Sequence, residues 1–379
     1  MQRRQILMAG GAAAVVAFGA GAWKIATPSL AKASEPWRAA GAGFGDARLN
    51  ALSYAILAPN PHNRQPWQFE LVGDDRIDVT CDLGKRLPST DPLDRQITIG
   101  FGCMLELLRQ AAAEAGYTAQ VTGFPDGEGQ PRLDARPVAR VVLVADRPAK
   151  DPLHAQVLAR RSTKEPYLDQ PVEDAAMEAL GAVVSPALRY GFSRSESERA
   201  AIAANAWEAW TIEQNTPATR RESIELMRIG NDAVVAQPDG IDMGGAFLST
   251  ANALGILTPE TLDTPGSRVF EEGFAQYRGM VDSTPRWAWI ASPGNSRAEQ
   301  LQAGASWVRL NLAAQAQGLA VHPWSHALQE FPQMEEPFRA LRRMIAPDGG
   351  TVQMFARVGY GPEVPASPRW PLEVKLIDG

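Results

Sequence analysis

The sequence contains only two cysteines and four histidines among its 379 residues. Two cysteines are too few for a disulfide framework, and Cys81 and Cys103 lack the Cys-x-x-Cys spacing of a metal site. We expect both to be core residues, although a single bridge between them stays open in an oxidising compartment. His322 and His326 are four positions apart, but Pro323 between them excludes a regular helix, which argues against a metal site there.

Several catalytic signatures are also missing. The chain has no Gly-x-Ser-x-Gly nucleophile elbow. The pair Gly100 and Gly102 is not followed by the third small residue of a dinucleotide-binding fingerprint. The formal charge is −6, and removing residues 1–33 takes away four positive charges and no negative one, which leaves about −10. Such an acidic chain is not expected to bind nucleic acid.

A long, strongly hydrophobic run is absent as well. The N-terminal stretch Leu7–Trp23 is rich in Gly and Ala and short for a bilayer span. It follows a pair of arginines at positions 3 and 4 and precedes two small-x-Ala cleavage options, at Ala31 and Ala33, so residues 1–33 predict an export signal. The paired arginines resemble a twin-arginine signal, although Gln2 precedes them, which predicts the twin-arginine translocase as a partner and the periplasm as the destination. A permanent N-terminal membrane anchor is the alternative. Because this route carries folded proteins, we expect a bound cofactor.

Helical and strand patterns follow one another in a similar order in two parts of the chain. The first part predicts a helix over 46–57, strands at 68–71 and 76–81, a helix over 97–115, and strands at 118–122 and 138–145. The second part predicts helices over 151–160, 171–183, 195–213 and 304–317, with strands at 189–193, 287–291, 319–323 and 352–358. The segment from Ile229 to Pro285 is rich in Gly and Pro, has no clear strand, and is predicted to be a lid or binding element.

An internal repeat connects the two parts. The helix between Gly102 and Gly116 has the same length as the one between Gly304 and Gly318, and the Leu and Ala positions within the two helices coincide. A chance match between two Ala-rich helices is the alternative. If the repeat is real, residues 46–148 and 150–375 form two similar units.

The loop Ala58–Trp67 has the most unusual composition of the chain. It contains three prolines, two Asn, a His, an Arg and a Gln. Proline restricts the residue before it, so Asn60 and Gln65 are expected to be extended on a stiff, non-helical backbone that presents amides to a ligand. An ordinary helix-to-strand connector is the alternative.

A basic cluster occurs at Arg160-Arg161-Ser162-Thr163-Lys164. Guanidinium groups grip phosphate oxygens in a bidentate fork, and a hydroxyl adds a hydrogen bond, so this cluster suits a phosphate. Arginines that simply balance the dipole at the end of a helix are the alternative.

Together, Asn63-Arg64-Gln65-Pro66-Trp67 and Arg160–Lys164 resemble two motifs of the nitroreductase family of FMN flavoproteins. In that family an Arg-Arg-Ser-x-Arg motif holds the FMN phosphate and pyrimidine edge, and Asn-x-Gln-Pro-Trp reaches the same flavin from the partner subunit of an intertwined dimer. Here Lys164 stands in place of the last Arg. The resemblance covers roughly residues 46–375 and is closest to an exported, double-length, Acg-like branch.

The resemblance implies an α+β fold in which two fused nitroreductase-like copies form an intramolecular pseudo-dimer with central mixed sheets flanked by helices. Each motif occurs only once, which implies one flavin site in a monomeric chain. The implied FMN-binding residues also include the segment beside the flavin ring and a basic residue near the C-terminus; the full set is His62, Asn63, Gln65, Trp67, Arg160, Arg161, Ser162, Lys164, Pro323, Trp324, Ser325 and Arg369.

The implied activity is the reduction of small oxidised substrates, such as nitroaromatics or quinones, through bound FMN. Lys164 is expected to stabilise the reduced flavin anion, no catalytic side chain is named, and the electron donor stays open. The alternative is a non-enzymatic flavin-sequestering protein in which the 229–285 insertion closes over FMN. Trp207, Trp210, Trp287 and Trp289 are expected to be core residues.

Overall fold

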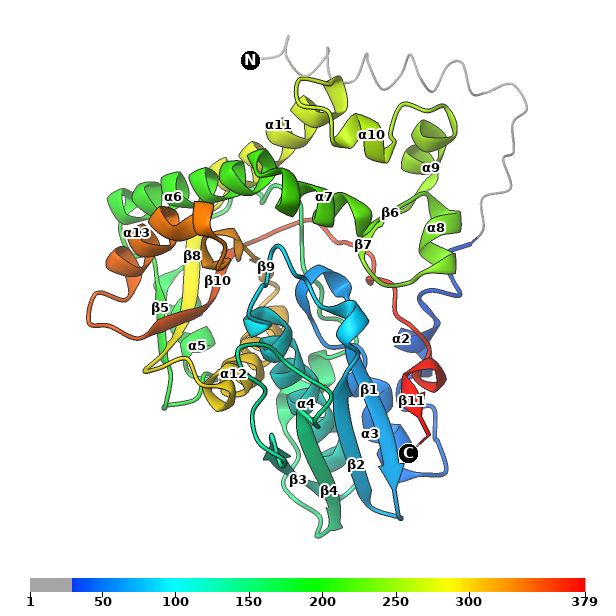
Figure 1. The fold of residues 1–379 in the computed structure, drawn as a ribbon. Coiled ribbons are helices and arrows are strands. Elements are labelled where there is room, and N and C mark those ends of the chain that lie inside the picture. The colour runs from blue at the N-terminus through cyan, green and yellow to red at the C-terminus, as the bar shows by residue number, and fades with distance from the viewer. Residues whose placement is uncertain (1–28, 379) are drawn as a thin grey trace.

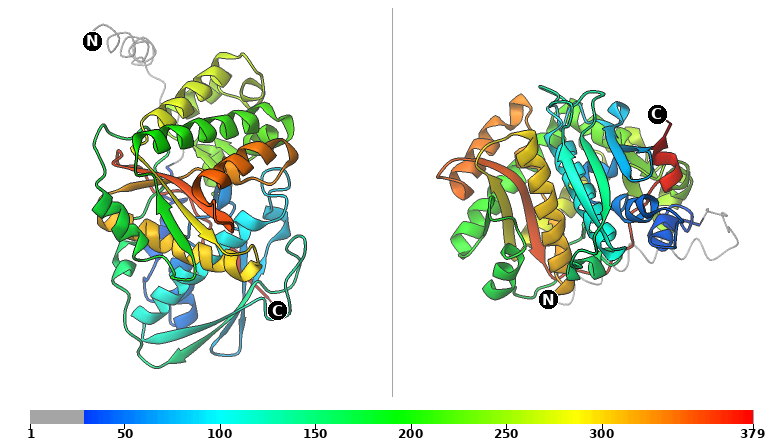
Figure 2. Two further views of the ribbon diagram at one scale, coloured as in Figure 1. Left: turned by 90° about the vertical axis from the view of Figure 1, so that its left-hand side faces the viewer. Right: turned by 90° about the horizontal axis from the view of Figure 1, so that it is seen from below.

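The computed structural model describes residues 29–378, so most of the predicted export signal, residues 1–28, lies outside the described part of the chain. Two β-sheets lie on opposite sides of a central pair of long helices, α4 (Arg95–Glu114) and α12 (Arg297–Ala316) (Figures 1 and 2). One continuous hydrophobic core contains residues from both helices and from both sheets. This arrangement confirms the predicted α+β architecture with two similar units.

The first unit contains a four-stranded antiparallel sheet in the order β1-β2-β4-β3, which a short strand from the C-terminus extends at its β1 edge. Helix α3 packs on α4 beside this sheet. The observed bounds agree with the sequence pattern to within two residues at most ends; they are α3 (Ala47–Ala55), β1 (Trp67–Val72), β2 (Arg76–Cys81), β3 (Tyr117–Gly123) and β4 (Ala139–Ala145).

The second unit repeats this topology. Its antiparallel sheet has the order β5-β8-β10-β9, so each strand has a counterpart at the same place in the first sheet. The helix α5 precedes β5 as α3 precedes β1; the bounds are α5 (Asp174–Gly181), β5 (Arg189–Phe192), β8 (Arg286–Ser292), β9 (Ala320–Pro323) and β10 (Thr351–Gly359). The predicted helix over 151–160 is wrong in type, because a 3-10 turn at Pro152–Gln156 is followed by an irregular turn.

The repeated glycines explain how α4 and α12 approach each other. A Cβ on Gly102 would lie 2.1 Å from the carbonyl oxygen of Leu301, and a Cβ on Gly304 would lie 2.0 Å from that of Ile99. Only glycine permits this crossing. Gly116 and Gly318 follow the two helices with positive φ, which suits the C-terminal cap of a helix.

Strand alternation places aromatic residues on the outer face of the second sheet. Trp287 and Trp289 of β8 belong to a second hydrophobic cluster, whereas the alternate residues Ala288 and Ile290 face the main core. The second cluster is covered by α6 (Glu196–Asn215) and α13 (Glu335–Ile345). Trp210, Trp287 and Trp289 are buried core residues as predicted, and Trp207 is half-buried beside them.

The insertion is longer than the sequence suggested. In the first unit three residues join β1 to β2, whereas all of residues 193–285 separate β5 from β8. The prediction of no strand there is wrong, because β6 and β7 pair in parallel. The insertion contains α6, α7 (Pro217–Glu225), β6 (Met227–Ile229), α8 (Asn231–Ala236), β7 (Ile241–Met243), α9 (Ala246–Ala253), α10 (Pro259–Leu262) and α11 (Arg268–Asp282).

The C-terminal arm connects the two units. After β10 the chain returns to the first unit, where β11 (Leu376–Ile377) pairs in parallel with β1 (Figure 1). At the other end of the described chain, α2 (Glu35–Ala39) lies beside α3. These two terminal segments meet near the loop that precedes β1.

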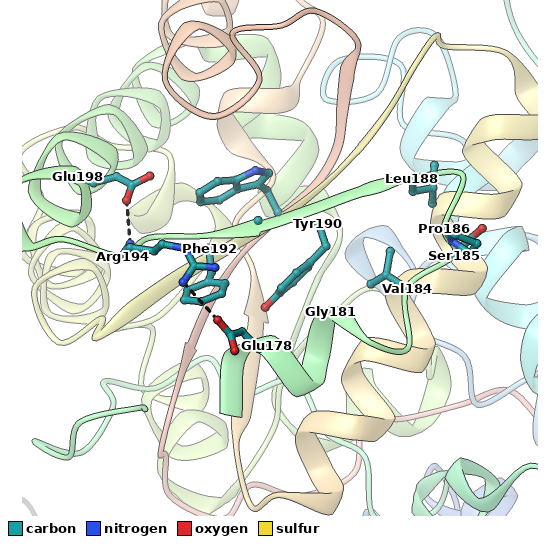
Figure 3. Close-up of a pocket in the computed structure, with 12 residues that line it drawn as sticks. Glu178, Gly181, Val184, Ser185, Pro186, Leu188, Tyr190, Phe192, Arg194 and Glu198 are labelled. Atoms are coloured by element: carbon teal, nitrogen blue, oxygen red, sulfur yellow. Dashed lines mark hydrogen bonds and ion pairs between the residues drawn. The ribbon is translucent and has the colours of Figure 1, made fainter. Parts of the chain in front are cut away.

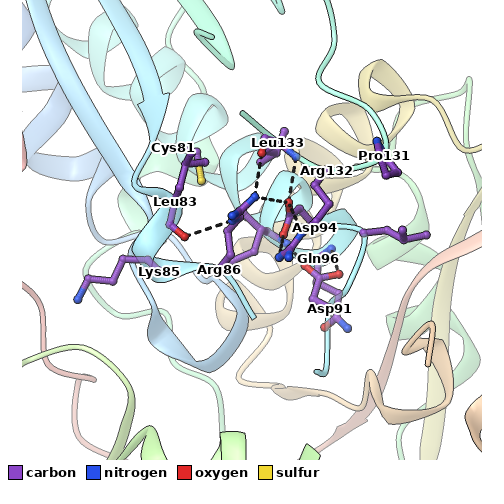
Figure 4. A network of polar contacts seen from close by, with 12 residues as sticks. Cys81, Leu83, Lys85, Arg86, Asp91, Asp94, Gln96, Pro131, Arg132 and Leu133 are labelled. Atoms are coloured by element: carbon purple, nitrogen blue, oxygen red, sulfur yellow. Dashed lines mark hydrogen bonds and ion pairs between the residues drawn. The ribbon is translucent and has the colours of Figure 1, made fainter. Parts of the chain in front are cut away.

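A buried carboxylate fixes the start of α4. Asp94 has a left-handed backbone, is completely buried, and accepts hydrogen bonds from the Arg132 guanidinium and the Leu133 N–H (Figure 4). Its backbone oxygen accepts a hydrogen bond from Arg297 at the start of α12. The same network therefore holds both central helices in register.

The described residues include both cysteines and every helix with assigned bounds. Cys81 and Cys103 are both buried and unbridged. Between residues 29 and 378 no helix combines the length and the apolar character needed to cross a bilayer. In the same range no three His, Cys, Asp or Glu side chains are grouped closely enough to hold a metal ion.

Candidate functional site

The proline-rich loop has an unusual backbone. A short 3-10 turn at Pro61–Asn63 is flanked by Asn60 in extended geometry, as expected. The expectation for Gln65 is wrong, since its φ is +49° although it precedes a proline, and His62 and Asn63 also have positive φ values. Strained backbone of this kind persists only where surrounding contacts hold it, and it is common at binding sites.

Those contacts come from distant parts of the chain. The Asn63 amide donates to the carbonyl of Pro368 (3.0 Å) and accepts from the Arg369 guanidinium (2.6 Å). The Gln65 amide donates to the carbonyl of Pro238 (2.7 Å) and accepts from the N–H of Trp370 (2.9 Å). The two amides therefore join the loop to the C-terminal arm and to the insertion, and their polar atoms are already engaged.

Three guanidinium groups gather beside this loop without a carboxylate. Arg160 and Arg369 are buried, and Arg161 is half-buried. Burial lowers the pKa of Arg160 to about 10 and that of Arg369 to about 9, and the mutual repulsion of the guanidiniums adds to both shifts. Within residues 29–378 none of the three forms an ion pair. Uncompensated buried charge is costly, so the cluster favours an anion.

The members of this cluster differ in the donors they have available. Every N–H of Arg369 is used, because it donates to the carbonyls of Ile56, Leu57, Ala58 and Pro368 and to side chains of Asn63 and Ser367. Arg160 has two buried nitrogens, Nε and Nη1, without an acceptor. Arg161 uses only Nη1, for the carbonyls of Leu158 and Arg160. Arg161 and Arg160 can thus donate to an anion, whereas Arg369 contributes charge.

A second group of side chains surrounds Lys164. Lys164 is exposed as a whole residue. Partial desolvation by the surrounding protein nevertheless lowers the pKa of its ammonium group. Burial lowers the pKa of His62 and of His326 to about 3, and the positive charge of Lys164 contributes to both shifts. Nδ1 of each histidine is buried without a partner. His62 of the first-unit loop and His326 of the segment after β9 therefore both lie near the charge of Lys164.

The other predicted site residues differ in how deeply they are buried. Ser162, Pro323 and Ser325 are half-buried, and the Ser162 hydroxyl has no hydrogen-bond partner in the described chain. Trp324 is fully buried, and its indole N–H donates to the carbonyl of Ala206 (3.0 Å). Trp67 is also fully buried and packs edge-on against Phe101 in the core. Both rings therefore belong to the hydrophobic clusters of the protein.

Two contributors were not found from the sequence. Trp37 places its ring under the guanidiniums of Arg161 and Arg369, at 4.9 Å and 5.3 Å from the ring centroid. The insertion residue Asp239 is buried against the loop and pairs with Arg228 (2.9 Å) and with Lys85. Neither residue belongs to a motif, and only the three-dimensional arrangement brings them to the site.

A separate pocket lies at the counterpart position in the second unit. It has a volume of about 660 Å³ and is lined by residues of α5, β5 and the connection between them, together with Arg194, Glu198 of α6 and Trp289 of β8 (Figure 3). Arg194 in this pocket contacts Glu178 (3.4 Å), and its N–H donates to the Glu198 carboxylate (2.8 Å). The positive charge there is already paired, which distinguishes this pocket from the Arg160 cluster.

Comparisons with known proteins agree with the resemblance in the motifs. A predicted NAD(P)H nitroreductase of Mycobacterium tuberculosis is 27% identical over 349 residues, which cover 87% of this chain and 94% of that protein. The predicted NAD(P)H nitroreductase Acg of the same organism is 26% identical over 86% of this chain and 94% of its own length. No protein-family model matches the chain.

Solved structures were found as well. The FMN-dependent nitroreductase NfnB from Mycobacterium smegmatis, in complex with NADPH, matches with a TM-score of 0.37 and 16% identity, covering 59% of this chain and 96% of that one. A predicted nitroreductase from Desulfovibrio desulfuricans in complex with FMN gives a TM-score of 0.32 and 15% identity over 61% of this chain and 98% of its own.

Proposed function

We propose that this protein is an FMN-binding oxidoreductase of the nitroreductase type, which reduces small oxidised substrates such as nitroaromatics or quinones. The observation that carries the proposal is the group of three guanidiniums without a carboxylate, next to the loop that resembles a nitroreductase motif. A terminal phosphate supplies the missing negative charge. The similarity to predicted nitroreductases over 87% of the chain supports the same function.

The residues present fit the phosphate end of FMN. Arg161 has free donors, Arg160 has two buried N–H groups without acceptors, and the Ser162 hydroxyl is unpartnered. We assign these three residues to the phosphate and Arg369 to charge balance and loop support. No adenine-binding fingerprint follows Gly100 and Gly102, which favours FMN over FAD.

The second group fits a polar aromatic ring. His62 and His326 each present an unpartnered ring nitrogen, and Lys164 adds a positive charge near both. When bound, FMN accepts hydride and passes electrons to the substrate. Lys164 favours negative charge that develops near it. NADH or NADPH is the proposed electron donor.

Flavin sequestration is the second candidate, and one observation favours it. The insertion residues Pro238 and Gly240 make hydrogen bonds to the site loop, through Gln65 and the carbonyl of Asn63. The insertion therefore covers the loop in this conformation. A protein that holds FMN but does not oxidise NADH or NADPH would have this function.

The test begins with the absorption spectrum of purified full-length protein. We expect flavin bands, release of FMN on denaturation, and bleaching after anaerobic addition of NADPH. Retention of FMN without bleaching by NADH or NADPH would favour sequestration. Protein that is colourless and does not take up added FMN would refute both candidates.

We also propose that the protein is exported by the twin-arginine route as a monomer. The support is the arginine pair at positions 3 and 4 and the weakly hydrophobic run that follows. Cell fractionation of the wild-type chain and of a variant with both arginines changed to lysine tests this proposal. Equal amounts of the two proteins in the periplasm would contradict it.

A further inference from the structure

Trp37 lies outside both units, yet it is part of the basic cluster. It belongs to the five-residue helix α2, and only 7% of its surface is exposed. Its ring faces two guanidiniums, those of Arg161 near the start of the second unit and Arg369 on the C-terminal arm. One aromatic side chain thus contacts cations from two distant parts of the sequence.

Backbone contacts fix the ring in this position. The indole N–H of Trp37 donates to the carbonyl of Ser367 (2.8 Å). The N–H of Arg369 donates to the carbonyl of Ala33 (2.9 Å), and the Arg369 guanidinium donates to the Ser367 hydroxyl (2.8 Å). The segment before α2 and the C-terminal arm therefore hold each other at Arg369.

An aromatic ring suits this position because it attracts cations without carrying a negative charge. Its quadrupole attracts guanidinium cations, which offsets part of their mutual repulsion. A carboxylate at the same position would attract them more strongly but would neutralise the charge that a ligand phosphate needs. The ring therefore orients Arg161 and Arg369 and leaves the cluster positive.

We propose that Trp37 is a positioning residue of the cofactor site, which holds Arg161 and Arg369 in place for the terminal phosphate of FMN. This inference rests on the proposed function. It extends the site to the N-terminal segment, which contains none of the motifs. It also predicts that the contribution of Trp37 depends on the phosphate and not on the flavin ring.

Riboflavin, which has the flavin ring but no phosphate, provides the test. Flavin is removed from full-length wild-type protein and from Trp37→Ala, and the dissociation constants for FMN and riboflavin are measured by fluorescence quenching. We expect Trp37→Ala to weaken FMN binding about tenfold and to leave riboflavin binding unchanged. Trp37→Phe retains a ring over the guanidiniums without the N–H, and we expect it to bind FMN within about threefold of wild type.

Trp207→Ala is the matched control, because Trp207 also lies under an arginine, Arg278 at 5.3 Å, but on the insertion helix α6. We expect it to change neither dissociation constant. Unchanged FMN binding in Trp37→Ala, or equal losses for FMN and riboflavin, would overturn the inference while the proposed function stands. Wild-type protein that binds riboflavin as tightly as FMN, or binds neither, would instead overturn the phosphate site itself.

Discussion

At the scale of single residues, Gln65 shows why local rules reach only part of this site. A proline after Gln65 favours extended backbone, yet the residue is left-handed. Its N–H donates to the Asn60 side chain (2.7 Å), its amide contacts Pro238 and Trp370, and its carbonyl accepts from Lys375 (2.7 Å). Together these bonds outweigh the local backbone preference. A rule based on neighbouring residues misses them, because three of the four partners are far away in the sequence.

Glu213 provides a prediction at the same scale. This carboxyl is 3% exposed on α6, and burial raises its pKa from 4.5 to about 7, helped by the nearby charge of Glu222. The Gln329 amide donates to it (2.6 Å), which opposes the shift in part. Because the folded pKa lies above the unfolded one, the folded state binds more protons between these values. Stability should fall by about 3 kcal/mol as the pH rises through this window.

Glu213→Gln removes this titration and keeps an oxygen for Gln329. Urea unfolding at about pH 5 and about pH 8 should show the variant gaining on wild type by about 3 kcal/mol at the higher pH. Glu208→Gln, at an exposed position of the same helix, serves as the control and should change nothing. An equal difference between Glu213→Gln and wild type at both pH values would count against the buried carboxyl.

At the scale of elements, the sequence predicts what periodicity and spacing determine. The eight strands of the two main sheets other than β11, and the central helix α4, were expected close to their observed bounds, because alternating or helical apolar patterns mark them. The start of α12 was missed, since this helix was expected from residue 304 and begins at Arg297. The full extent of the insertion was not predicted. Residues 193–228 have ordinary helical patterns, so nothing in the sequence marks them as part of an insertion. In the first unit the corresponding strands, β1 and β2, form a hairpin, and this comparison shows that α6 and α7 separate the two strands of the equivalent hairpin, β5 and β8.

The crossing of α4 and α12 gives a prediction for the helix pair. Gly304→Ala would place a methyl group 2.0 Å from the carbonyl oxygen of Ile99, so the helices must separate. We expect a loss of about 3 kcal/mol in unfolding free energy, since the closest atom belongs to rigid backbone. Gly273→Ala on α11 is the control, because nothing lies within 4 Å of its Cβ position, and it should be neutral or slightly stabilising. Comparable stabilities for the two variants would refute the close crossing.

Asp239 gives a prediction for the insertion. Its buried carboxylate joins Lys85 of the first unit to Arg228 of the insertion, and Arg64 lies 3.7 Å away. Asp239→Asn leaves these cations without their anion, which should cost about 2 to 3 kcal/mol and loosen the insertion from the loop. Limited proteolysis should then cut within residues 229–285 faster than in wild type. The control is Asp282→Asn, an exposed partner of Arg278, and equal cleavage of the two variants would exclude the anchoring role.

At the scale of the whole molecule, the two units share a topology but differ in chemistry. The loop between α3 and β1 carries the amides that tie the site together, whereas its counterpart, residues 182–188, contains no Asn, Gln or Trp. The basic cluster likewise occurs once. Arg194 in the counterpart pocket is neutralised by Glu178 and lies 3.6 Å from Asp174. The symmetry therefore extends to the sheets and central helices and stops at the site.

This asymmetry predicts one FMN per chain. Asn63 and Trp67 belong to the first unit, and Arg160, Arg161 and Arg369 belong to the second, so a single chain supplies every predicted part of one site. Titration of stripped protein with FMN should reach equivalence near one, with a monomer mass in solution.

Arg161→Ala should weaken binding more than Asn63→Ala weakens it directly, because a charged contact to phosphate contributes about 1.5 to 3 kcal/mol, against about 1 for a neutral amide. Because Asn63 also holds the loop, its variant should lose thermal stability as well, which Arg161→Ala should retain. An equivalence point near two, or a dimer that shares flavins between chains, would show that the counterpart pocket or a second copy completes a site.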